Sequence, residues 1–326
     1  MKEVAIGIDI GGTFSKFGII DKDGESLGDN SIETTGYEKV ESFIKALSDA
    51  ILKLKDSIGK DLTVVGVGIG APNGNYYSGT IEYAPNLPWK GVIPMVELFS
   101  KFYTVPVTLT NDANAAAIGE MVYGGAKNMK DFVVITLGTG LGSGIVSNGE
   151  LVYGHDGFAG EVGHVQAIPD GRICGCEKRG CLETYASATG IKRTVFELLC
   201  DETVPSKLRD VSFNDLTAKM IGKAAQEGDP IARKAFEFTG RILGMKLADT
   251  VAHSSPEAIF LFGGLVNAGE MLFKPTKEHF EKNLLKIYRN KIKILPSGLR
   301  ETNAAVLGAS ALVWKERAKN PALVNK

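Results

Sequence analysis

Two hydrophobic periodicities alternate along this chain, and together they predict an α/β fold. Continuous, β-branched apolar runs are typical of buried strands. Such runs are VAIGIDI, TVVGVGIGA, VPVTLT, DFVVITL and AIFLF. Between the first two runs, apolar residues over residues 37–58 recur every three or four positions, as an amphipathic helix requires. Strands that alternate with helices are the pattern of α/β proteins.

Turn and capping residues predict where several elements begin and end. Asp21–Gly24, DKDG, is typical of a hairpin turn that closes a second strand over residues 16–21. A helix is expected to open after Asp112 and to stop at Gly124–Gly125. The last apolar helical pattern covers residues 302–316.

Two further helix starts carry capping signals. Ser212 and Asp215 have the spacing of a capping box. Asp229 and Pro230 fit the N-cap and first position of a long helix that reaches about His253.

A repeated pattern in the sequence predicts two related halves. Residues 9–20, DIGGTFSKFGII, and residues 136–146, TLGTGLGSGIV, each read as a strand, a glycine-rich turn and a returning strand. A length of 326 residues also exceeds what one hydrophobic core usually supports, so two domains are expected. A hinge near residue 112 would suit a cleft between them.

Composition narrows the function classes. A hydrophobic fraction of 44%, a charged fraction of 23% and a net charge of −1 are typical of a folded protein without a nucleic-acid partner. The first apolar run contains Asp9 and is not followed by a cleavage site, so it does not read as a signal peptide. No apolar stretch approaches the roughly 20 residues of a membrane helix. We expect a cytoplasmic protein that does not contact a membrane.

Two glycine-rich turns are candidate phosphate cradles. Gly11 and Gly12 would let the backbone approach a phosphate, and Thr13 adds a hydroxyl. Asp9 ends the preceding strand, where it could hold Mg²⁺, and Lys16 could reach the same phosphates. Residues 138–142 offer the second cradle, through Gly138, Thr139 and Gly140. Each turn taken singly could equally be a tight hairpin that binds nothing.

Rival nucleotide motifs are absent or out of context. The sequence contains no Gly-x-x-x-x-Gly-Lys-Ser/Thr pattern. Gly66, Gly68 and Gly70 resemble a dinucleotide turn, but they lie inside a strand, and no helix follows. We expect these glycines to serve close packing.

Asp112 is the candidate catalytic base. It follows the strand VPVTLT and precedes the helix ANAAAIGE, so its carboxylate would stand at a strand end above a cleft. A carboxylate in that place can accept the proton of an attacking hydroxyl group. It can equally be the N-cap of the following helix, and its neighbour Asn111 is equally ambiguous as a turn residue.

His164, Cys174, Cys176 and Cys181 make a complete tetrahedral zinc set within 18 residues. Four protein ligands leave no open position, which predicts a structural zinc ion. The alternative is reduced thiols beside an incidental histidine. Cys200 lies in the apolar helical pattern TVFELLC and is expected to be a buried hydrophobic residue.

Glu161 and Glu183 flank the predicted metal site. Either carboxylate could accept hydrogen bonds from sugar hydroxyls. The alternative is that both are ordinary solvated acids that bind no ligand.

Taken together, these motifs resemble the ROK family (repressors, open reading frames and kinases) of the actin-like ATPase superfamily, from Ile6 to about Trp314. DIGGTFSKFGIID resembles the first phosphate motif, LTNDANAAAIGE the catalytic segment, and VITLGTGLGSGIV the second phosphate motif. GFAGEVGHVQAIPDGRICGCEKRGCLETYAS resembles the family signature, and LFGGLVNAG the turn on the adenosine side. The chain departs from the pattern at Glu177, where members often have Gly, and at Phe14, where many have Lys.

The resemblance implies a role for each matched residue. It implies that Asp112 is the base, that zinc binds at the His and three Cys, and that ATP with Mg²⁺ binds at the two glycine-rich turns. It implies adenosine-side contacts at Gly263 and Gly264. The implied sugar contacts are Asn86, Asn111, Asp112, Glu161, His164 and Glu183.

The resemblance also implies the architecture. Two actin-like (ribonuclease H-like) α/β domains would flank a cleft that holds ATP and sugar. The smaller domain is expected at residues 1–112 plus 304–326, and the larger one, with the zinc-binding loop, at 113–303. A homodimer is implied as well.

The implied activity is ATP-dependent phosphorylation of a hexose, with glucose converted to glucose 6-phosphate, because CLETYAS looks most like the glucokinase branch. Such an activity belongs to carbohydrate metabolism and glycolysis. An N-acetylglucosamine or N-acetylmannosamine kinase is the alternative. A non-catalytic sugar sensor is a second one, and a zinc-ribbon nucleic-acid module fits the net charge poorly. Family repressors carry an N-terminal helix-turn-helix, for which a first strand starting by Val4 is expected to leave no room.

Overall fold

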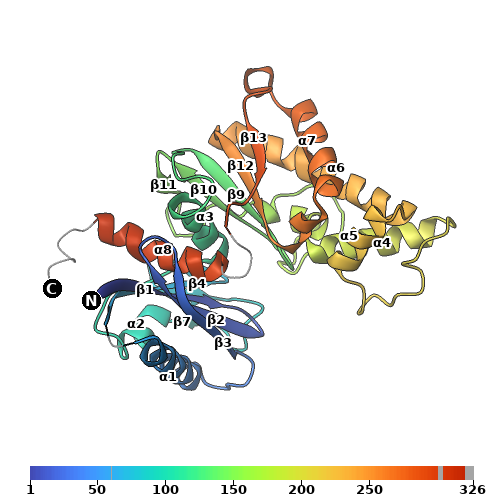
Figure 1. Cartoon of the computed structure of the whole chain (residues 1–326). Coiled ribbons are helices and arrows are strands. Elements are labelled where there is room, and N and C mark those ends of the chain that lie inside the picture. The colour runs from blue at the N-terminus through green and yellow to red at the C-terminus, as the bar shows by residue number, and fades with distance from the viewer. Residues whose placement is uncertain (60, 300–303, 320–326) are drawn as a thin grey trace. The chain divides into compact units, whose positions relative to one another are not determined.

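The computed structural model describes residues 1–59, 61–299 and 304–319 (Figure 1). The chain divides into two compact units. The first comprises Met1–Met129, Leu151–Ala159 and the chain from Gly298 onward, and the second comprises Lys130–Glu150 and Gly160–Ser297. Those parts of the expected domains that fall on residues 60, 300–303 and 320–326 lie outside the described residues.

The unit boundary differs from the one expected at residue 112. Helix α3 (Asp112–Val122) contacts helix α8 (Ala304–Lys319), and this packing keeps α3 in the first unit. An ideal Cβ on Gly308 would lie 2.6 Å from the carbonyl carbon of Ala115, so the two helix backbones touch. The boundary between the two units therefore comes after α3, because α3 packs on α8.

The first unit is built on a sheet with strand order β3-β2-β1-β4-β8. Strands β1, β2 and β3 are antiparallel neighbours, whereas β1, β4 and β8 run parallel. Their bounds are β1 Lys2–Ile10, β2 Phe14–Asp21, β3 Ser26–Glu33, β4 Leu62–Ala71 and β8 Val107–Asn111.

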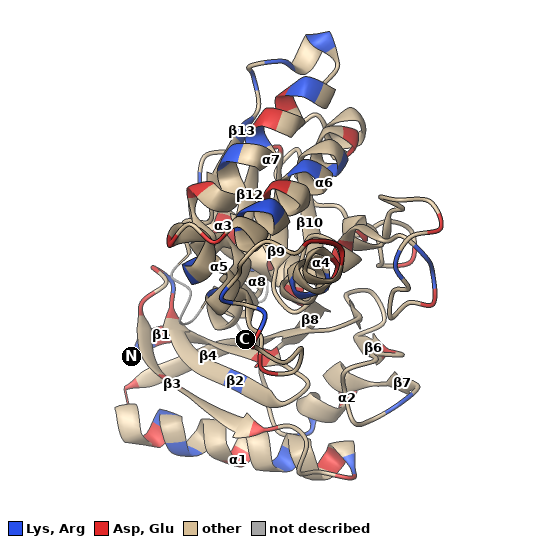
Figure 2. Cartoon of the chain, turned by 90° about the vertical axis from the view of Figure 1, so that its right-hand side faces the viewer, with Lys and Arg blue, Asp and Glu red and all other residues tan. Residues whose placement is uncertain are grey.

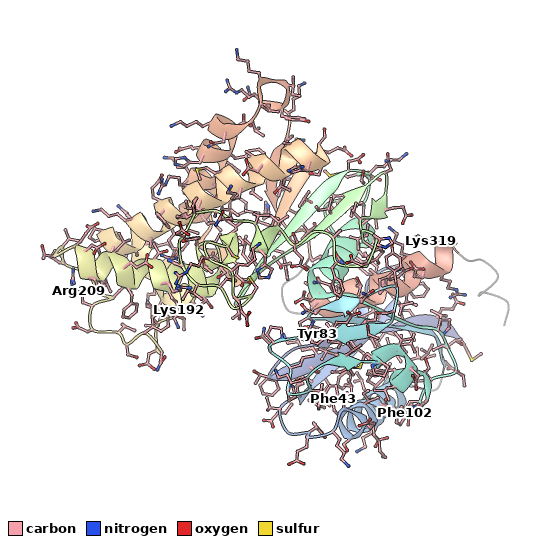
Figure 3. All side chains as sticks on the ribbon, turned by 180° about the vertical axis from the view of Figure 1, so that it is seen from behind. Phe43, Tyr83, Phe102, Lys192, Arg209 and Lys319 are labelled. Carbon is pink, nitrogen blue, oxygen red and sulfur yellow. The ribbon has the colours of Figure 1, made fainter. Side chains whose placement is uncertain are left out.

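The two faces of this sheet differ in side-chain size. Ile6, Ile8, Val67 and Ile69 belong to one buried cluster with residues of helix α1 (Val40–Ile58). Phe43 of α1, labelled in Figure 3, is fully buried, and its ring centroid lies 4.8 Å from that of Trp89.

The other face of the sheet carries several glycines on β1 and β4, and their lack of side chains lets α8 lie directly on the strands. An ideal Cβ on Gly68 would overlap Ala309, and one on Gly7 would lie 3.1 Å from the carbonyl carbon of Val306. An ideal Cβ on Gly66 would lie 2.5 Å from a methyl group of Val313 in α8, and one on Gly70 would lie 3.3 Å from the Cβ of Ala115 in α3. The expectation that the β4 glycines serve close packing is confirmed.

Smaller elements complete the first unit. Helix α2 (Met95–Ser100) follows a three-stranded sheet with order β5-β6-β7. The strands of that sheet are β5 Gly74–Asn75, β6 Thr80–Glu82 and β7 Val92–Ile93.

The second unit repeats the sheet design, with strand order β11-β10-β9-β12-β13. Strands β9 and β10 form a hairpin, and β9, β12 and β13 run parallel. Their bounds are β9 Phe132–Leu137, β10 Leu141–Ser147, β11 Glu150–Leu151, β12 Ala258–Phe262 and β13 Lys293–Pro296. Two hairpin-led sheets of this kind are what the repeated strand–turn–strand pattern predicted.

Helices account for most of the remaining second unit. The α-helices are α4 Ala188–Asp201, α5 Ala218–Gln226, α6 Pro230–Ser254 and α7 Glu270–Asn283. The 3₁₀ turns are η1 Val162–His164, η2 Leu182–Thr184, η3 Gly264–Ala268 and η4 Lys286–Tyr288. Helices α6 and α7 pack on each other, and the buried face of α6 joins the core around β9 and β12.

Most local signals are confirmed. The amide of Gly24 donates to the carbonyl of Asp21 at 3.1 Å and closes the predicted hairpin turn. Asp229 caps α6, because its Oδ1 accepts from the amide of Ala232 at 3.0 Å. The Ser212 prediction is wrong in position. The amide of Asp215 donates to Ser212 Oγ at 3.3 Å, and the Ser212 hydroxyl donates to Asp215 Oδ2, so only half of a capping box forms, and the helix starts at Ala218 with Thr217 as N-cap.

Surface charge is mixed rather than segregated. Figure 2 shows Lys and Arg interspersed with Asp and Glu along α1 and α7. Among the described residues, no helix combines the length and the apolar character that crossing a bilayer requires.

Candidate functional site

Asp9 and Asp112 gather at one edge of the first sheet. Strands β1, β4 and β8 are parallel and neighbouring, so their carboxyl ends meet at the same edge. Asp9 pairs with Gly70 across β1 and β4, and an ideal Cβ on Gly70 would lie 3.8 Å from the Cα of Asp112. The candidate Mg²⁺ ligand Asp9 and the candidate base Asp112 therefore share one strand edge.

Asn111, and not Asp112, caps helix α3. Asn111 Oδ1 accepts from the amides of Ala113 at 2.7 Å and Asn114 at 3.3 Å. Asp112 is the first helical residue, and its Oδ1 accepts from the amide of Ala113 at 2.8 Å. The interpretation of Asp112 as a mere N-cap therefore loses its support, because its neighbour makes the cap.

Both carboxylates have raised pKa values. Burial raises the pKa of Asp9 to about 6, the charge of Asp112 adds to the shift, and Lys16 opposes it. Burial also raises the pKa of Asp112, against the hydrogen bond from Ala113. Solvent reaches the Asp112 side chain, but the surrounding protein still desolvates it. A nearby cation or a proton donor would relieve both groups.

The first glycine-rich turn connects β1 to β2. The amide of Gly11 donates to the carbonyl of Phe14 at 3.2 Å, which closes the turn. Lys16 lies opposite Asp9 in the β1–β2 register. An ideal Cβ on Gly12 would lie 2.5 Å from the carbonyl oxygen of Asn86, so this turn and the predicted sugar contact Asn86 are neighbours. Thr13 and Phe14 are exposed there.

The second glycine-rich turn connects β9 to β10. Gly142 donates its amide to Thr136 Oγ1 at 3.1 Å across the base of the turn. No hydrogen bond from the amides of Gly138, Thr139 or Gly140 is found within the part of the chain that the structure describes. Backbone amides without a protein partner are available to an anion such as a phosphate.

Gly263 and Gly264 stand beside this second turn. Strands β9 and β12 are parallel, with Thr136 paired to Phe262. Gly263 has a φ of 108°, and an ideal Cβ there would lie 2.7 Å from the carbonyl oxygen of Leu137. Only glycine fits both the left-handed conformation and this approach. The structure thus brings together the two loops predicted to face the nucleotide within the second unit.

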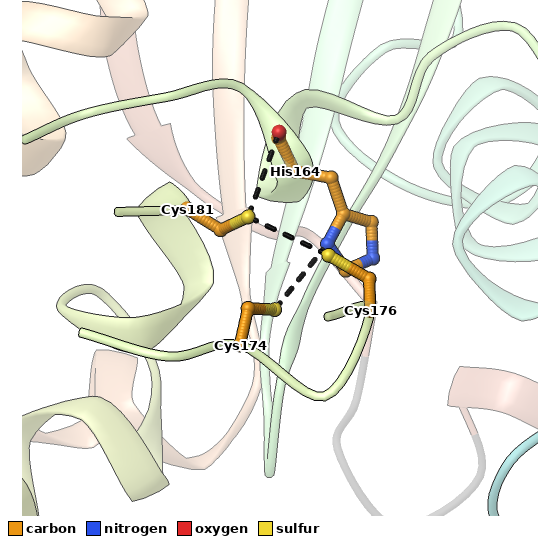
Figure 4. Close-up of side chains that lie close together, drawn as sticks. All are labelled: His164, Cys174, Cys176 and Cys181. Carbon is orange, nitrogen blue, oxygen red and sulfur yellow. Dashed lines mark hydrogen bonds between the residues drawn. The ribbon is translucent and has the colours of Figure 1, made fainter. Parts of the chain in front are cut away.

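The predicted metal ligands converge (Figure 4). Their four ligand atoms lie within 4.8 Å of one another. His164 Nδ1 is 3.6 Å from Cys174 Sγ, and Cys176 Sγ is 3.6 Å from Cys181 Sγ. Tetrahedral zinc with bonds of about 2.0–2.3 Å separates its ligands by about 3.6–3.8 Å, so the residues fit that ion. Burial raises the pKa of the Cys174 thiol to about 12, so a thiolate there needs a cation.

The structure also describes two other residues discussed for this region, Glu177 and Cys200. Glu177 has a φ of 70°, the left-handed conformation that glycine favours, which explains why glycine suits this position. The prediction for Cys200 is wrong: its side chain is exposed, because it lies near the C-terminal end of α4 on the outer side of the helix.

The two flanking acids have different surroundings. Glu161 is the N-cap of η1, and its Oε2 lies 4.0 Å from His164 Nε2. Glu183 lies in η2, where its Oε2 accepts from the amide of Leu141 at 2.9 Å and its Oε1 accepts from Cys174 Sγ at 3.5 Å. Glu183 thus joins the predicted metal ligands to the second glycine-rich turn, a link that nothing in its sequence spacing indicates.

Arg172 is a buried residue that sequence reasoning missed. Its guanidinium donates to the carbonyls of Thr184 at 2.6 Å and Gly190 at 3.1 Å, and to Glu197 Oε1 at 2.8 Å. It also lies 4.5 Å from the ring centroid of Tyr185. Arg172 therefore ties the start of the metal loop to η2 and α4.

A model of the ROK family matches residues 5–316. The chain belongs to the ROK family. A glucokinase from Halalkalibacterium halodurans is 36% identical over 280 residues, which cover 85% of this chain and 84% of the relative. An N-acetylglucosamine repressor from Escherichia coli O157:H7 is 31% identical over 274 residues, covering 82% of this chain and 65% of the repressor.

Solved ROK structures agree with the fold. The crystal structure of a ROK family glucokinase from Streptomyces griseus, in complex with glucose and AMPPNP, matches this ROK chain with a TM-score of 0.81. It is 33% identical, and the match covers 96% of this chain and 99% of that one. The expected fold class, a mixed α/β protein with two actin-like domains, is confirmed.

Proposed function

We propose that this ROK chain is a sugar kinase that transfers the γ-phosphoryl group of ATP to the 6-hydroxyl of a hexose, with glucose as the preferred acceptor. Asp112 carries the proposal, because Asn111 makes the helix cap and the Asp112 carboxylate stands with Asp9 at one edge of the sheet. The glucokinase relatives support the same activity.

In the proposed reaction, Asp112 accepts the proton of the sugar hydroxyl as its oxygen attacks the γ-phosphorus. The bond between that phosphorus and the bridging oxygen breaks, and ADP leaves with the electron pair. A raised pKa makes Asp112 a better proton acceptor than an ordinary aspartate. Phosphoryl transfer otherwise requires mainly positioning and charge neutralisation.

The two glycine-rich turns would hold the phosphates, and Lys16 would add a positive charge beside Asp9. Asp9 fits the role of Mg²⁺ ligand, because it is a partly buried carboxylate at a strand end whose raised pKa a cation would lower. Mg²⁺, when bound, would neutralise phosphate charge.

Asn86, Asn111, Glu161, His164 and Glu183 are the proposed sugar contacts. Asn111 Oδ1 is engaged in the helix cap, so its amide nitrogen is the group that remains for a sugar hydroxyl. Zinc on His164 Nδ1 would leave Nε2 for the same purpose.

A coupled assay tests the function. ADP release is followed with glucose, mannose, fructose, N-acetylglucosamine and N-acetylmannosamine, and glucose 6-phosphate is detected with its dehydrogenase. We expect ADP formation that depends on sugar, with the highest kcat/KM for glucose. A higher kcat/KM for an acetylated sugar would favour the N-acetylhexosamine kinase instead.

A non-catalytic sugar sensor is the second candidate, and the match to a repressor favours it. Calorimetry that finds sugar binding without any ADP formation would support the sensor. A homodimer, expected from the family, is part of the proposal and is tested by sedimentation velocity of the purified chain.

A further inference from the structure

The second glycine-rich turn is held at both ends by one short segment, residues 183–188. At one end, the amide of Leu141 donates to Glu183 Oε2 at 2.9 Å. At the other end, the amide of Ala188 donates to the carbonyl of Gly138 at 2.9 Å. The amides of Thr139 and Gly140 lie between these two anchor points, and neither carries a hydrogen bond among the described residues.

The backbone of the turn passes so close to the Glu183 carboxylate that Gly140 has no room for a side chain. An ideal Cβ on Gly140 would overlap Glu183 Oε2 and would lie 3.0 Å from its Cδ. Gly140 has no left-handed backbone angle that would explain its identity. The missing side chain therefore makes room for the carboxylate.

The residues that follow Glu183 are held in place by hydrogen bonds from Arg172. The carbonyl of Thr184, the next residue, accepts from Arg172 at 2.6 Å, and the Tyr185 hydroxyl accepts from the amide of Arg172 at 2.9 Å. Gly163 of η1 also approaches the turn, because an ideal Cβ on it would lie 3.1 Å from the carbonyl carbon of Leu141. The support of the turn thus extends into the metal-binding loop on both sides.

We propose that Glu183 and the Ala188 amide form a clamp that preorganises residues 138–141 for phosphate, so that Glu183 is a positioning residue for the nucleotide. The proposal rests on the proposed function and adds to it, since the same glutamate is a proposed sugar contact. A cradle whose amides are fixed before binding costs less conformational entropy when the phosphate arrives.

A further consequence is coupling between the substrates. A sugar hydroxyl bound to Glu183 would restrain the carboxylate that anchors Leu141. Sugar and nucleotide would then each raise the affinity for the other by the same factor.

Two substitutions remove the two ends of the clamp separately. Glu183→Ala removes the acceptor at Leu141. Ala188→Pro removes the donor at Gly138. Proline suits that position, because Ala188 is the first residue of α4 and the preceding Ser187 has an extended backbone.

The matched control is Ala218→Pro. Ala218 is likewise the first residue of its helix, α5, and the preceding Thr217 is likewise extended. Its amide makes no hydrogen bond among the residues that the structure describes. This substitution should leave nucleotide affinity unchanged.

The first measurement is the Kd of Mg-AMPPNP by calorimetry without sugar. We expect both clamp variants to weaken it about five- to twentyfold, and the control to stay within twofold. Glucose affinity should fall in Glu183→Ala and stay within twofold in Ala188→Pro. A pure sugar contact at Glu183 would lower only glucose affinity, and that result would overturn the proposal.

The second measurement does not depend on kinase activity. Hydrogen exchange of the Leu141 amide is followed in protein labelled with ¹⁵N-leucine. We expect at least tenfold faster exchange in Glu183→Ala and in Gly140→Ala, because the latter displaces the carboxylate. Unchanged exchange in both would refute the clamp. Faster exchange in a protein that forms no ADP would instead refute the proposed function and leave the clamp standing.

Discussion

The charge of Asp112 reaches Asp9 across the edge of the first sheet and adds to the burial that raises the pKa of Asp9 to about 6. Two acids at the ends of β1 and β8 therefore oppose each other's ionisation. Such an arrangement destabilises the folded protein at neutral pH, and it is relieved when a cation binds.

Replacing Asp9 by Asn should stabilise the protein in the absence of Mg²⁺. The pKa of Asp9 is raised, so the unfolded chain loses this proton near pH 4 and the folded chain only near pH 6. The free energy of unfolding of the wild type therefore falls as pH rises through that window. We expect the variant to gain little at pH 4 and up to about 3 kcal/mol at pH 7.5.

Urea unfolding followed by tryptophan fluorescence measures this gain, since Trp89 and Trp314 both lie in the first unit. Asp21→Asn is the matched control with the opposite sign. Burial acts to raise the pKa of Asp21, but hydrogen bonds from Lys2 and two backbone amides hold it below the ordinary value. That variant should lose more stability at pH 7.5 than at pH 3, because the stabilisation by an acid with a lowered pKa fades as the pH falls. Parallel behaviour of the two variants would contradict the prediction.

Asp112→Asn should abolish most of the turnover. An amide has nearly the same shape but cannot accept the hydroxyl proton, and general bases contribute typically 10²–10⁴-fold. We expect kcat to fall by about that factor while the glucose Kd changes less than tenfold. Asn111→Asp is a useful companion, because aspartate also caps helices and should keep the fold. Undiminished kcat in Asp112→Asn would remove this residue from the mechanism.

The strand ends and the clustering of His164 with the three cysteines could be predicted from sequence because both are local signals. A buried run that stops at Asp9 or Asp112 gives the acid's place on the sheet, and parallel strands then bring such acids to one edge. His164 and the three cysteines lie within one short stretch, so spacing sufficed for the metal prediction.

What could not be predicted depends on contacts between distant residues. Glu183 accepts from Leu141, 42 positions away, and only the folded turn reveals it. Strand β3 is polar, with much of its length exposed, and so has no apolar signal. The difference between the expected domain boundary and the boundary of the compact units has the same origin, because α3 is held in the first unit by α8 from the other end of the chain.

The metal prediction is tested with two cysteine variants. Cys176→Ser should lower zinc affinity by at least tenfold and lower the Tm, because binding free energy at a structural site is folding free energy. Cys200→Ser, which changes an exposed thiol outside the cluster, should retain about one zinc ion per chain. Elemental analysis and calorimetry report both quantities. Equal zinc content in the two variants would show that the cluster does not hold the ion.

Arg172→Lys should destabilise the second unit although it keeps the positive charge. Lysine cannot reproduce the forked donation to Thr184, Gly190 and Glu197, so buried carbonyls would lose their partners. We expect the free energy of unfolding to fall by about 2–4 kcal/mol. Arg193→Lys is the control, since Arg193 makes one exposed bond to the carbonyl of Ile173. Similar losses of unfolding free energy in both variants would show that the hydrogen bonds of Arg172 have no special role in stability.

Glycine on the α8 face of the first sheet should be indispensable where helix backbone lies on strand backbone. A Cβ at Gly68 would overlap Ala309 and approach its carbonyl carbon to 2.8 Å, and a backbone cannot move aside as a side chain can. We expect Gly68→Ala to cost about 3 kcal/mol or more, measured by calorimetry. Gly222→Ala is the matched control inside α5, where the added Cβ would meet only Ala268 at 3.8 Å. That change should stabilise by up to about 1 kcal/mol, because alanine is the better helix former. A tolerated Gly68→Ala would mean that α8 does not rest on β4.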